Sequence, residues 1–297
     1  FWLDYNIHLC NIEDQDNFVK EERIKFEKLS RYSCYFLIAF LMTDGFGWTT
    51  ILVVNNYLNR ESIKNRTMQF ETQLYYPIPF FESSYNFYAW LPVHIFNTYC
   101  VFIACIVIII ALTTNFMFVF QAIGHIKIFK YRMQTIYVES LKDEECFYKL
   151  IEIIKYHIFM INAFKEFEQT FGFFVSAYYL FNLTTDSYFV YMFMLGDDRN
   201  RFTYLGMFIV YMGSLIIMSF VLEKVKRQSD DISVRVYSIN WLDMSIKNKK
   251  TFLLLLMRSQ SVLQFTGMGG FRAGVAPMIN IIKSTFSLYV LLKAKQS

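Results

Sequence analysis

Two aspartates lie inside long apolar stretches, and their position demands a chemical explanation. Asp44 lies in the middle of the stretch from Cys34 to Val54, and Asp186 is the only charged residue between Phe171 and Leu195. A charged side chain that faces lipid costs roughly 2.5 kcal/mol or more, so each carboxyl group must face a partner, water or a ligand. Two explanations remain open: a polar anchor in a ligand cavity or ion path, or an interhelical hydrogen bond to Thr, Tyr or Asn neighbours.

The residues around Asp44 favour the first explanation there. In the stretch MTDGFGWTT (residues 42–50), Gly45 and Gly47 remove side-chain bulk beside Phe46 and Trp48. Small residues next to large aromatic ones are what a small aromatic-walled cavity needs.

Other patterns that carry chemistry are missing from the sequence. The four histidines are far apart and form no HxxxH or HExxH pair, the five cysteines form no CxxC pair, and no GxSxG, P-loop or GxGxxG motif occurs. Glu166 and Glu168 lie beside Lys165, which is typical of a solvated helix face. The sequence therefore predicts a protein that is not an enzyme and that holds no metal ion or cofactor.

Composition and hydropathy predict an all-α, polytopic membrane protein with one domain over residues 1–297. The chain is 55% hydrophobic and 20% aromatic, and uncharged runs long enough to cross a bilayer occupy residues 99–120 and 202–222. The five expected spans are residues 34–54, 99–120, 171–195, 202–222 and 271–292; the last contains Arg272, Pro277 and Lys283 and so reads as a broken helix. The basic residues lie between apolar runs rather than on one face, which argues against nucleic-acid binding.

The distribution of basic residues predicts the orientation in the bilayer. The segments before residue 34, between 120 and 171, and between 222 and 271 carry 20 Lys and Arg residues, against seven in the other loops and the carboxyl end. Basic loops stay cytoplasmic, so the carboxyl terminus is expected outside. The sequon Asn65-Arg66-Thr67 falls in an outer loop and predicts a glycan on Asn65. The second sequon, at Asn182, is expected inside a helix and unglycosylated.

The carboxyl-terminal third resembles the insect odorant receptors. It carries Trp241 in VYSINWLDM, then LLLLMRSQ, a Gly-rich break (TGMGGFRAGVAP, residues 266–277) and a final KSTFSLYVLLK. The resemblance continues upstream in YHIFMINAFKEFEQTFGFF (residues 156–174), the LYYPIP loop and EERIKFEKLSRYSCYF. One position departs from the pattern, because the family commonly has Tyr-Ser where this chain has Phe286-Ser287. The ending of the related gustatory receptors, TYhhhhhQF, is absent, which favours the odorant branch.

The resemblance implies a function, partners and a location. The five spans would be helices three to seven of a seven-helix subunit, with the first two missing from this chain. The subunit would bind a small volatile molecule and join the shared odorant co-receptor in a hetero-tetrameric, ligand-gated, non-selective cation channel. That channel would lie in the plasma membrane of olfactory sensory neurons. Residues 121–170 and 223–266 would form a cytoplasmic helical anchor between subunits.

Helix position and side-chain chemistry nominate the ligand contacts, and the resemblance to the family nominates the pore-lining residues. The candidate ligand contacts are Asp44, Phe46, Trp48, Phe96, Tyr99, Tyr178 and Tyr179. The candidate pore-lining residues are Phe286, Tyr289 and Leu292, spaced i, i+3 and i+6 on the last helix, where Tyr289 would be bulkier than the usual family residue. The alternative is that this face packs against neighbouring helices.

Two other functions remain possible from the sequence. A secondary transporter would also explain Asp44, Asp186 and a broken helix, although no inverted repeat pairs the spans. A truncated, non-functional receptor fragment would explain the two missing helices.

Overall fold

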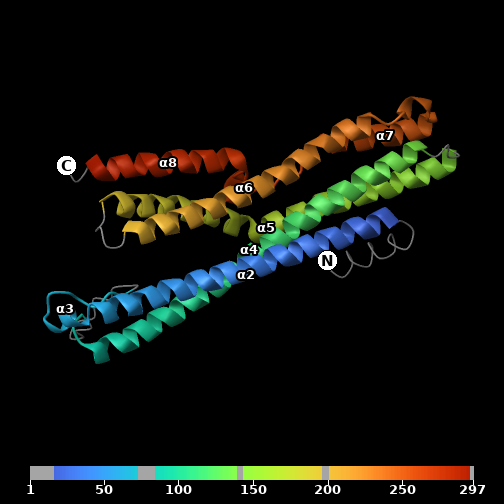
Figure 1. The fold of residues 1–297 in the computed structure, drawn as a ribbon. Coiled ribbons are helices and arrows are strands. Elements are labelled where there is room, and N and C mark those ends of the chain that lie inside the picture. Colours follow the sequence, from blue (N-terminus) through green and yellow to red (C-terminus); the bar gives the residue numbers. More distant parts are fainter. Residues whose placement is uncertain (1–16, 73–83, 139–142, 196–200, 295–297) are drawn as a thin grey trace. The chain divides into compact units, whose positions relative to one another are not determined.

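The structure is a computed structural model that describes residues 17–72, 84–138, 143–195 and 201–294, and its secondary structure is helical (Figure 1). The long helices are α2 (Asn17–Leu58), α4 (Phe87–Val138), α5 (Asp143–Leu195) and α6 (Arg201–Tyr237). The shorter elements are α3 (Arg60–Lys64), η1 (Trp241–Asp243), α7 (Ile246–Ser259), η2 (Met268–Gly270) and α8 (Val275–Ala294). The expectation of an all-α membrane bundle is confirmed.

Three helices of the described chain are long and apolar enough to cross a membrane: α2, α4 (over Phe87–Gln134) and α6. They contain the expected spans 34–54, 99–120 and 202–222. The expected span 171–195 lies in the second half of α5, where Asn182, Thr184 and Asp186 lower the mean hydropathy. The helix α8 is apolar but shorter than these three.

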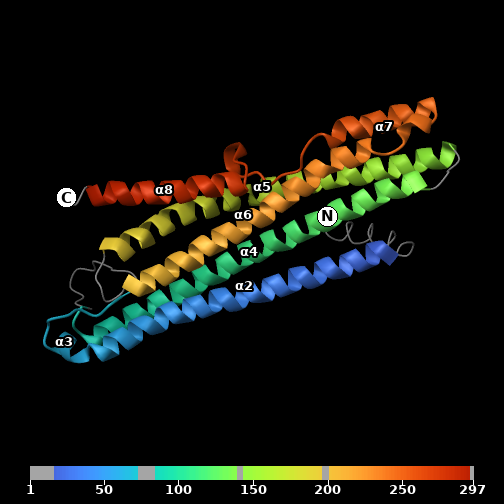
Figure 2. The same ribbon diagram turned by 45° about the horizontal axis from the view of Figure 1, so that its top comes forward.

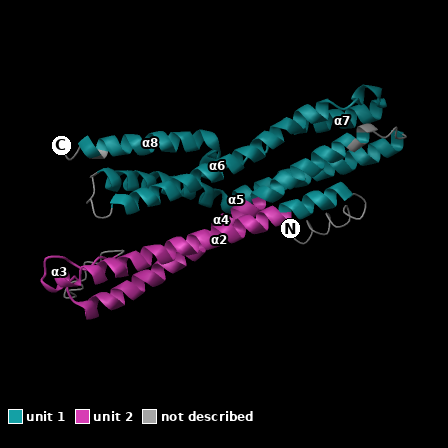
Figure 3. Cartoon of the chain, viewed as in Figure 1, with its two compact units in different colours: residues 1–26, 119–297 teal, residues 27–118 magenta. Residues whose placement is uncertain are grey.

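The chain divides into two compact units (Figure 3). Unit 1 comprises residues 1–26 and 119–297, and unit 2 comprises residues 27–118. Both α2 and α4 contribute a segment to each unit.

In unit 2, α2 and α4 pack through small and aromatic side chains. A Cβ atom added to Gly45 would lie 3.1 Å from the Cys105 sulfur, so the two helices approach closely at this level. The ring of Phe46, next to Gly45, meets the Phe102 ring on α4 edge to face, with centroids 4.9 Å apart. The short helix α3 follows α2 at the end of the unit where α4 begins (Figure 1).

In unit 1, α5 is the central helix. It packs against α6 and α8 along one part of its length and against α7 along another (Figure 2). The carboxyl-terminal part of α4 joins the same core through Ile126, Phe129 and Met133, each of them at most 1% exposed. This arrangement agrees with the expected helical extensions at residues 121–170 and 223–266.

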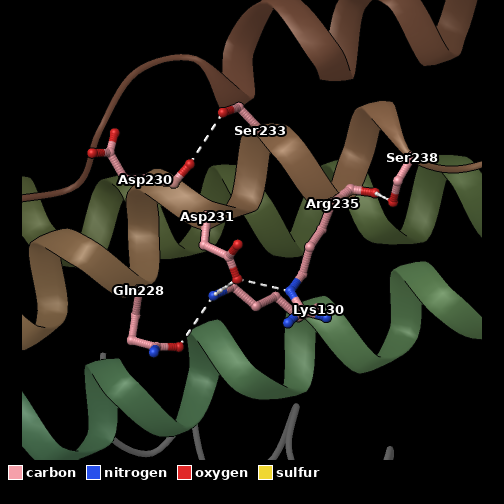
Figure 4. A network of polar contacts seen from close by, with 7 residues as sticks. All are labelled: Lys130, Gln228, Asp230, Asp231, Ser233, Arg235 and Ser238. Carbon is pink, nitrogen blue, oxygen red and sulfur yellow. Dashed lines mark hydrogen bonds and ion pairs between the residues drawn. The ribbon is translucent and has the colours of Figure 1, made fainter.

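A polar cluster ties α4 to α6 in this part of unit 1 (Figure 4). The Lys130 ammonium is 2.8 Å from an Asp231 carboxylate oxygen and 3.1 Å from the Gln228 side-chain oxygen. The same Asp231 oxygen accepts a 2.8 Å hydrogen bond from the Arg235 guanidinium. Hydrogen bonding from Arg235 and Lys130 lowers the pKa of Asp231, so this carboxylate stays ionised at neutral and mildly acidic pH.

A short hairpin separates α7 from α8 and corrects the start of the fifth expected span from residue 271 to Val275. The Gly267 amide donates to the Phe271 carbonyl (2.6 Å), the Ala273 amide donates to the Phe265 carbonyl (3.0 Å), and Thr266 pairs with Arg272. Arg272 therefore lies in the hairpin and not in the helix. The hairpin ends at Gly274, whose φ of 150° disfavours any residue with a Cβ atom.

Candidate functional site

The hydroxyl of Tyr179 joins three helices of unit 1 at the point where α8 begins. It lies 3.0 Å from the Ser219 hydroxyl on α6, accepts a 3.2 Å hydrogen bond from the Gly274 amide, and lies 3.4 Å from the Gly274 carbonyl. Tyr179 is 3% exposed. Glu223 of α6 adds a second contact, because its carboxylate accepts a 3.4 Å hydrogen bond from the Val275 amide. The first turn of α8 is thus held by both α5 and α6.

The hairpin before α8 is held by α5 as well. The Ser176 hydroxyl, three residues before Tyr179, accepts a 2.8 Å hydrogen bond from the Met268 amide. A Cβ atom on Gly267 would collide with that hydroxyl, so only glycine permits this approach. Further down α5, the Phe164 and Phe167 rings pack on Phe265 with centroids 5.2 and 5.1 Å away. The hairpin and the first turn of α8 are therefore both in direct contact with α5.

Three buried polar side chains lie beyond Tyr179 in the sequence, two on α5 and one on α8. Asn182, Asp186 and Thr285 are 1%, 0% and 0% exposed. Among the described residues, no hydrogen-bond partner is found for the side-chain oxygen of Asn182, for either oxygen of Asp186 or for the hydroxyl of Thr285. Buried polar atoms are normally satisfied, so each of these atoms could still accept or donate a hydrogen bond with a water molecule or a polar ligand group.

Asp186 is fully buried, and both explanations for its carboxyl group remain open. An interhelical hydrogen bond to a Thr, Tyr or Asn neighbour is not found within the described part of the chain. Tyr178, two turns earlier on α5, instead bonds to the Ser214 hydroxyl on α6 at 2.8 Å. The carboxyl group of Asp186 thus faces the bundle interior rather than lipid, as its cost of burial requires.

The structure places five of the candidate ligand contacts in unit 2 and two in unit 1. On α2, Asp44 and Trp48 are partly exposed and Phe46 is 56% exposed, while on α4 Phe96 and Tyr99 are 54% and 62% exposed. The two tyrosines of unit 1, Tyr178 and Tyr179, have hydroxyl groups already bonded to α6 and, for Tyr179, to Gly274. Their roles in binding stay predictions.

The candidate pore-lining residues differ in their surroundings. The buried stripe of α8 runs through Met278, Ile281 and Thr285, and Tyr289, four residues further on, continues it and is half-buried. Phe286 points away from this stripe and is 52% exposed. The side chain of Leu292 lies outside the described residues. In the structure of this chain, therefore, Phe286 is more accessible than Tyr289.

The expected glycosylation site is accessible. Asn65 follows the last turn of α3 and is exposed, and the Thr67 hydroxyl of its sequon bonds to the Ser62 carbonyl. Asn182 of the second sequon lies inside α5, nearly fully buried. In the described chain no three His, Cys, Asp or Glu side chains converge as a metal site would need.

Sequence reasoning missed the residues that hold α8. Ser176, Ser219, Glu223 and Phe265 are ordinary residues in an apolar or helical context, and no spacing marks them. Ser176, Ser219 and Glu223 share a position on α5 or α6 level with the Gly-rich break, and Phe265 lies in the hairpin itself; these positions become visible only once the helices are packed.

Comparisons with known proteins agree with this architecture. The profile of the 7tm Odorant receptor family matches residues 5–286. A 78-residue stretch is 27% identical to Odorant receptor 30a of Drosophila melanogaster, and it covers 26% of this chain and 21% of that receptor.

Two solved structures share the fold. One, of the insect olfactory receptor OR5 from Machilis hrabei in complex with eugenol, superposes with a TM-score of 0.68 at 13% identity and covers 93% of this chain and 70% of that one. Another structure of that receptor gives a TM-score of 0.65 at 14% identity, covering 92% and 69%. The family profile extends over nearly the whole sequence, and the chain belongs to the insect odorant receptor family.

Proposed function

We propose that this chain is the odorant-binding subunit of a ligand-gated, non-selective cation channel that it forms with the shared co-receptor. The observation that carries the proposal is the family match over residues 5–286. The subunit would act in the plasma membrane of olfactory sensory neurons, with its carboxyl terminus outside, as the excess of basic residues in the expected cytoplasmic segments favours.

The ligand proposed for the chain is a small volatile molecule bound among its apolar helices. Such a molecule is held by dispersion and by a few hydroxyl or carboxyl groups rather than by ion pairs. On α2 and α4, Asp44, Phe46, Trp48, Phe96 and Tyr99 supply these groups. The α5 tyrosines are proposed for the same role. Eugenol, which the Machilis hrabei receptor holds in its solved structure, has this chemical character.

The contacts of α5 support a route from ligand to channel. Tyr179 bonds to the first residues of α8, and Ser176 bonds to the hairpin before it. A ligand that shifts or rotates α5 changes the free energy of these contacts and so biases the position of α8. The proposal assigns α8 to the wall of the ion path, near whose outer end Phe286, Tyr289 and Leu292 lie.

Electrical recording tests the proposed activity. The full-length gene product is co-expressed with the co-receptor, and a panel of volatiles is applied under voltage clamp. The expected result is a ligand-evoked cation current that is absent when either protein is omitted. Ion-coupled uptake of a substrate without such a current would replace the receptor with a secondary transporter.

Cysteine accessibility tests the pore assignment. Phe286→Cys and Tyr289→Cys are compared with Thr285→Cys, whose position is 0% exposed and serves as the buried control. A membrane-impermeant thiol reagent applied from outside should change the current through the Phe286 and Tyr289 variants and leave the Thr285 variant unchanged. If Tyr289→Cys is labelled and neither current nor permeability changes, Tyr289 packs against neighbouring helices and does not line the path.

A further inference from the structure

A pocket of about 370 Å³ lies at the outer end of unit 2, where α2, α3 and the start of α4 meet. Its lining consists of Val53, Asn56, Tyr57, Arg60, Ile63, Lys64, Phe70, Tyr85, Phe87 and Trp90. This volume falls at the lower end of the range of about 300–1,000 Å³ that small-molecule sites occupy. None of the candidate ligand contacts discussed above lines it, so it is a separate site.

One wall of the pocket is aromatic. The Phe70 and Trp90 rings stack with centroids 5.3 Å apart, and the Phe87 ring lies 5.9 Å from Trp90. Trp90 is only 3% exposed, so its ring is fixed by its neighbours. Aromatic faces of this size bind the apolar part of a ligand by burial and dispersion.

The wall is held in place by hydrogen bonds to the backbone of Glu71. Its carbonyl oxygen accepts from the Trp90 indole and from the Asn56 side-chain amide, both at 3.0 Å, and its amide donates to the Asn56 oxygen at 2.8 Å. Phe70, the preceding residue, is thereby fixed against Trp90. Because the walls of this pocket are already ordered, ligand binding needs little further loss of conformational entropy in the protein.

The rim of the pocket is positive. Arg60 and Lys64 lie one turn apart on α3 and both line the pocket, and no ion pair to either is found among the described residues. The guanidinium of Arg60 lies over the Tyr57 ring, 5.0 Å from its centroid. The nearby acids do not line the pocket: Glu61 is on another side of α3, and the Glu71 carboxylate accepts a hydrogen bond from Asn55.

We propose that this outer pocket binds an amphiphile with a single anionic head and an apolar tail. The head would pair with Arg60 and Lys64, and the tail would lie against Phe70, Phe87 and Trp90. A cation in the same place would face two positive side chains, and a neutral molecule would leave both without a counter-charge. Two sources share this chemistry: a free amphipathic carboxylic acid and the headgroup of an anionic lipid in the outer leaflet.

Photolabelling of the purified chain in nanodiscs of neutral phosphatidylcholine tests the proposal without any need for channel activity. The probe is dodecanoic acid with a diazirine at the tail end, and dodecanol with the same diazirine is its uncharged counterpart. We expect mass spectrometry to find the acid, and not the alcohol, on peptides that contain residues 53–64, Phe70 or residues 84–90. Arg60→Gln with Lys64→Gln should reduce this labelling about fivefold, whereas the charge-preserving Arg60→Lys with Lys64→Arg should retain it.

Two further arms identify the source. Displacement of the probe by unlabelled dodecanoic acid, with no effect of added phosphatidylglycerol, assigns the site to a free acid; displacement by phosphatidylglycerol in the disc assigns it to lipid. Val53→Trp fills the pocket without removing a charge and should also reduce labelling. Equal labelling by the alcohol, or labelling that survives both the Gln pair and Val53→Trp, would overturn the proposal.

Discussion

Mild acid should loosen the core that α4 and α5 form in unit 1, because two histidines are buried there as neutral rings. His125 on α4 is 8% exposed, and its Nδ1 lies 2.5 Å from the Tyr156 hydroxyl on α5. His157 on α5 is 2% exposed and lies against the Phe129 ring, with centroids 5.3 Å apart. Burial lowers the pKa of His125 to about 3, and burial together with the Arg258 charge lowers the pKa of His157 to about 4.

The direction and size of the effect follow from these values. Because the folded pKa lies below the value of about 6.5 for an exposed histidine, the stabilisation is complete above pH 6.5 and is lost as pH falls toward 4 and then 3. Between pH 7.5 and pH 5.0 the unfolded segment gains nearly one proton per histidine while the folded one gains almost none. Protonation of each ring therefore reduces the free energy of local unfolding of this core by about 2 kcal/mol. This corresponds to an increase of about 30-fold in the equilibrium constant for local unfolding, which we call opening.

The neighbouring carboxylates do not interfere in this pH window. Burial raises the pKa of Glu22, but hydrogen bonds and charges from Lys25 and Lys127 outweigh it and leave the pKa below its ordinary value. The pKa of Asp231 is also lowered, by Arg235 and Lys130. Both groups therefore remain ionised at pH 5.0, and the change reports the histidines.

Hydrogen exchange followed by mass spectrometry measures this opening. On peptides that cover residues 121–138 and 143–165, protection corrected for intrinsic rates should fall about 30-fold for each histidine that the opening exposes. His125→Gln should remove the loss of protection, about 30-fold, that His125 contributes. His94→Gln, in unit 2, should leave the pH dependence of these peptides unchanged. Equal protection at the two pH values, or an unchanged pH dependence in His125→Gln, would refute the reasoning.

Three other predictions address the remaining features. Tyr179→Phe leaves the Ser219 hydroxyl and the Gly274 amide without a partner and should destabilise the protein by about 1–3 kcal/mol, seen as a lower unfolding temperature; Tyr178→Phe, which loses one partner, should cost less. Trp48→Ala should weaken odorant responses without reducing surface delivery, and unchanged dose-response curves for every active odorant would assign Trp48 to helix packing instead. Asn65→Gln should remove one glycan, and an epitope tag at residue 65 should be labelled on intact cells while a tag at Ser245 should not; the reverse pattern would contradict the proposed topology.

The sequence alone was sufficient for the fold class, for three of the spans and for the family. Hydropathy over about 20 residues is a local property, so residues 34–54, 99–120 and 202–222 could be assigned without any knowledge of their neighbours. The Gly-rich break also predicted the separation of α7 from α8, because Gly and Pro act locally on the backbone conformation. The start of α8 was misplaced by four residues, since the hairpin over Phe265–Ala273 is closed by pairings that periodicity does not reveal.

The tertiary structure decided what each polar side chain faces. Tyr179 was nominated as a ligand contact for its chemistry and position, but its hydroxyl bonds to residues 40 and 95 positions away in the chain. The partners of Lys130 lie 98 and 101 positions away, and the outer pocket joins residues of three helices that no motif connects. A sequence window registers propensity and hydropathy over a few turns, whereas these contacts depend on which helix faces pack together, and that is set by the whole bundle.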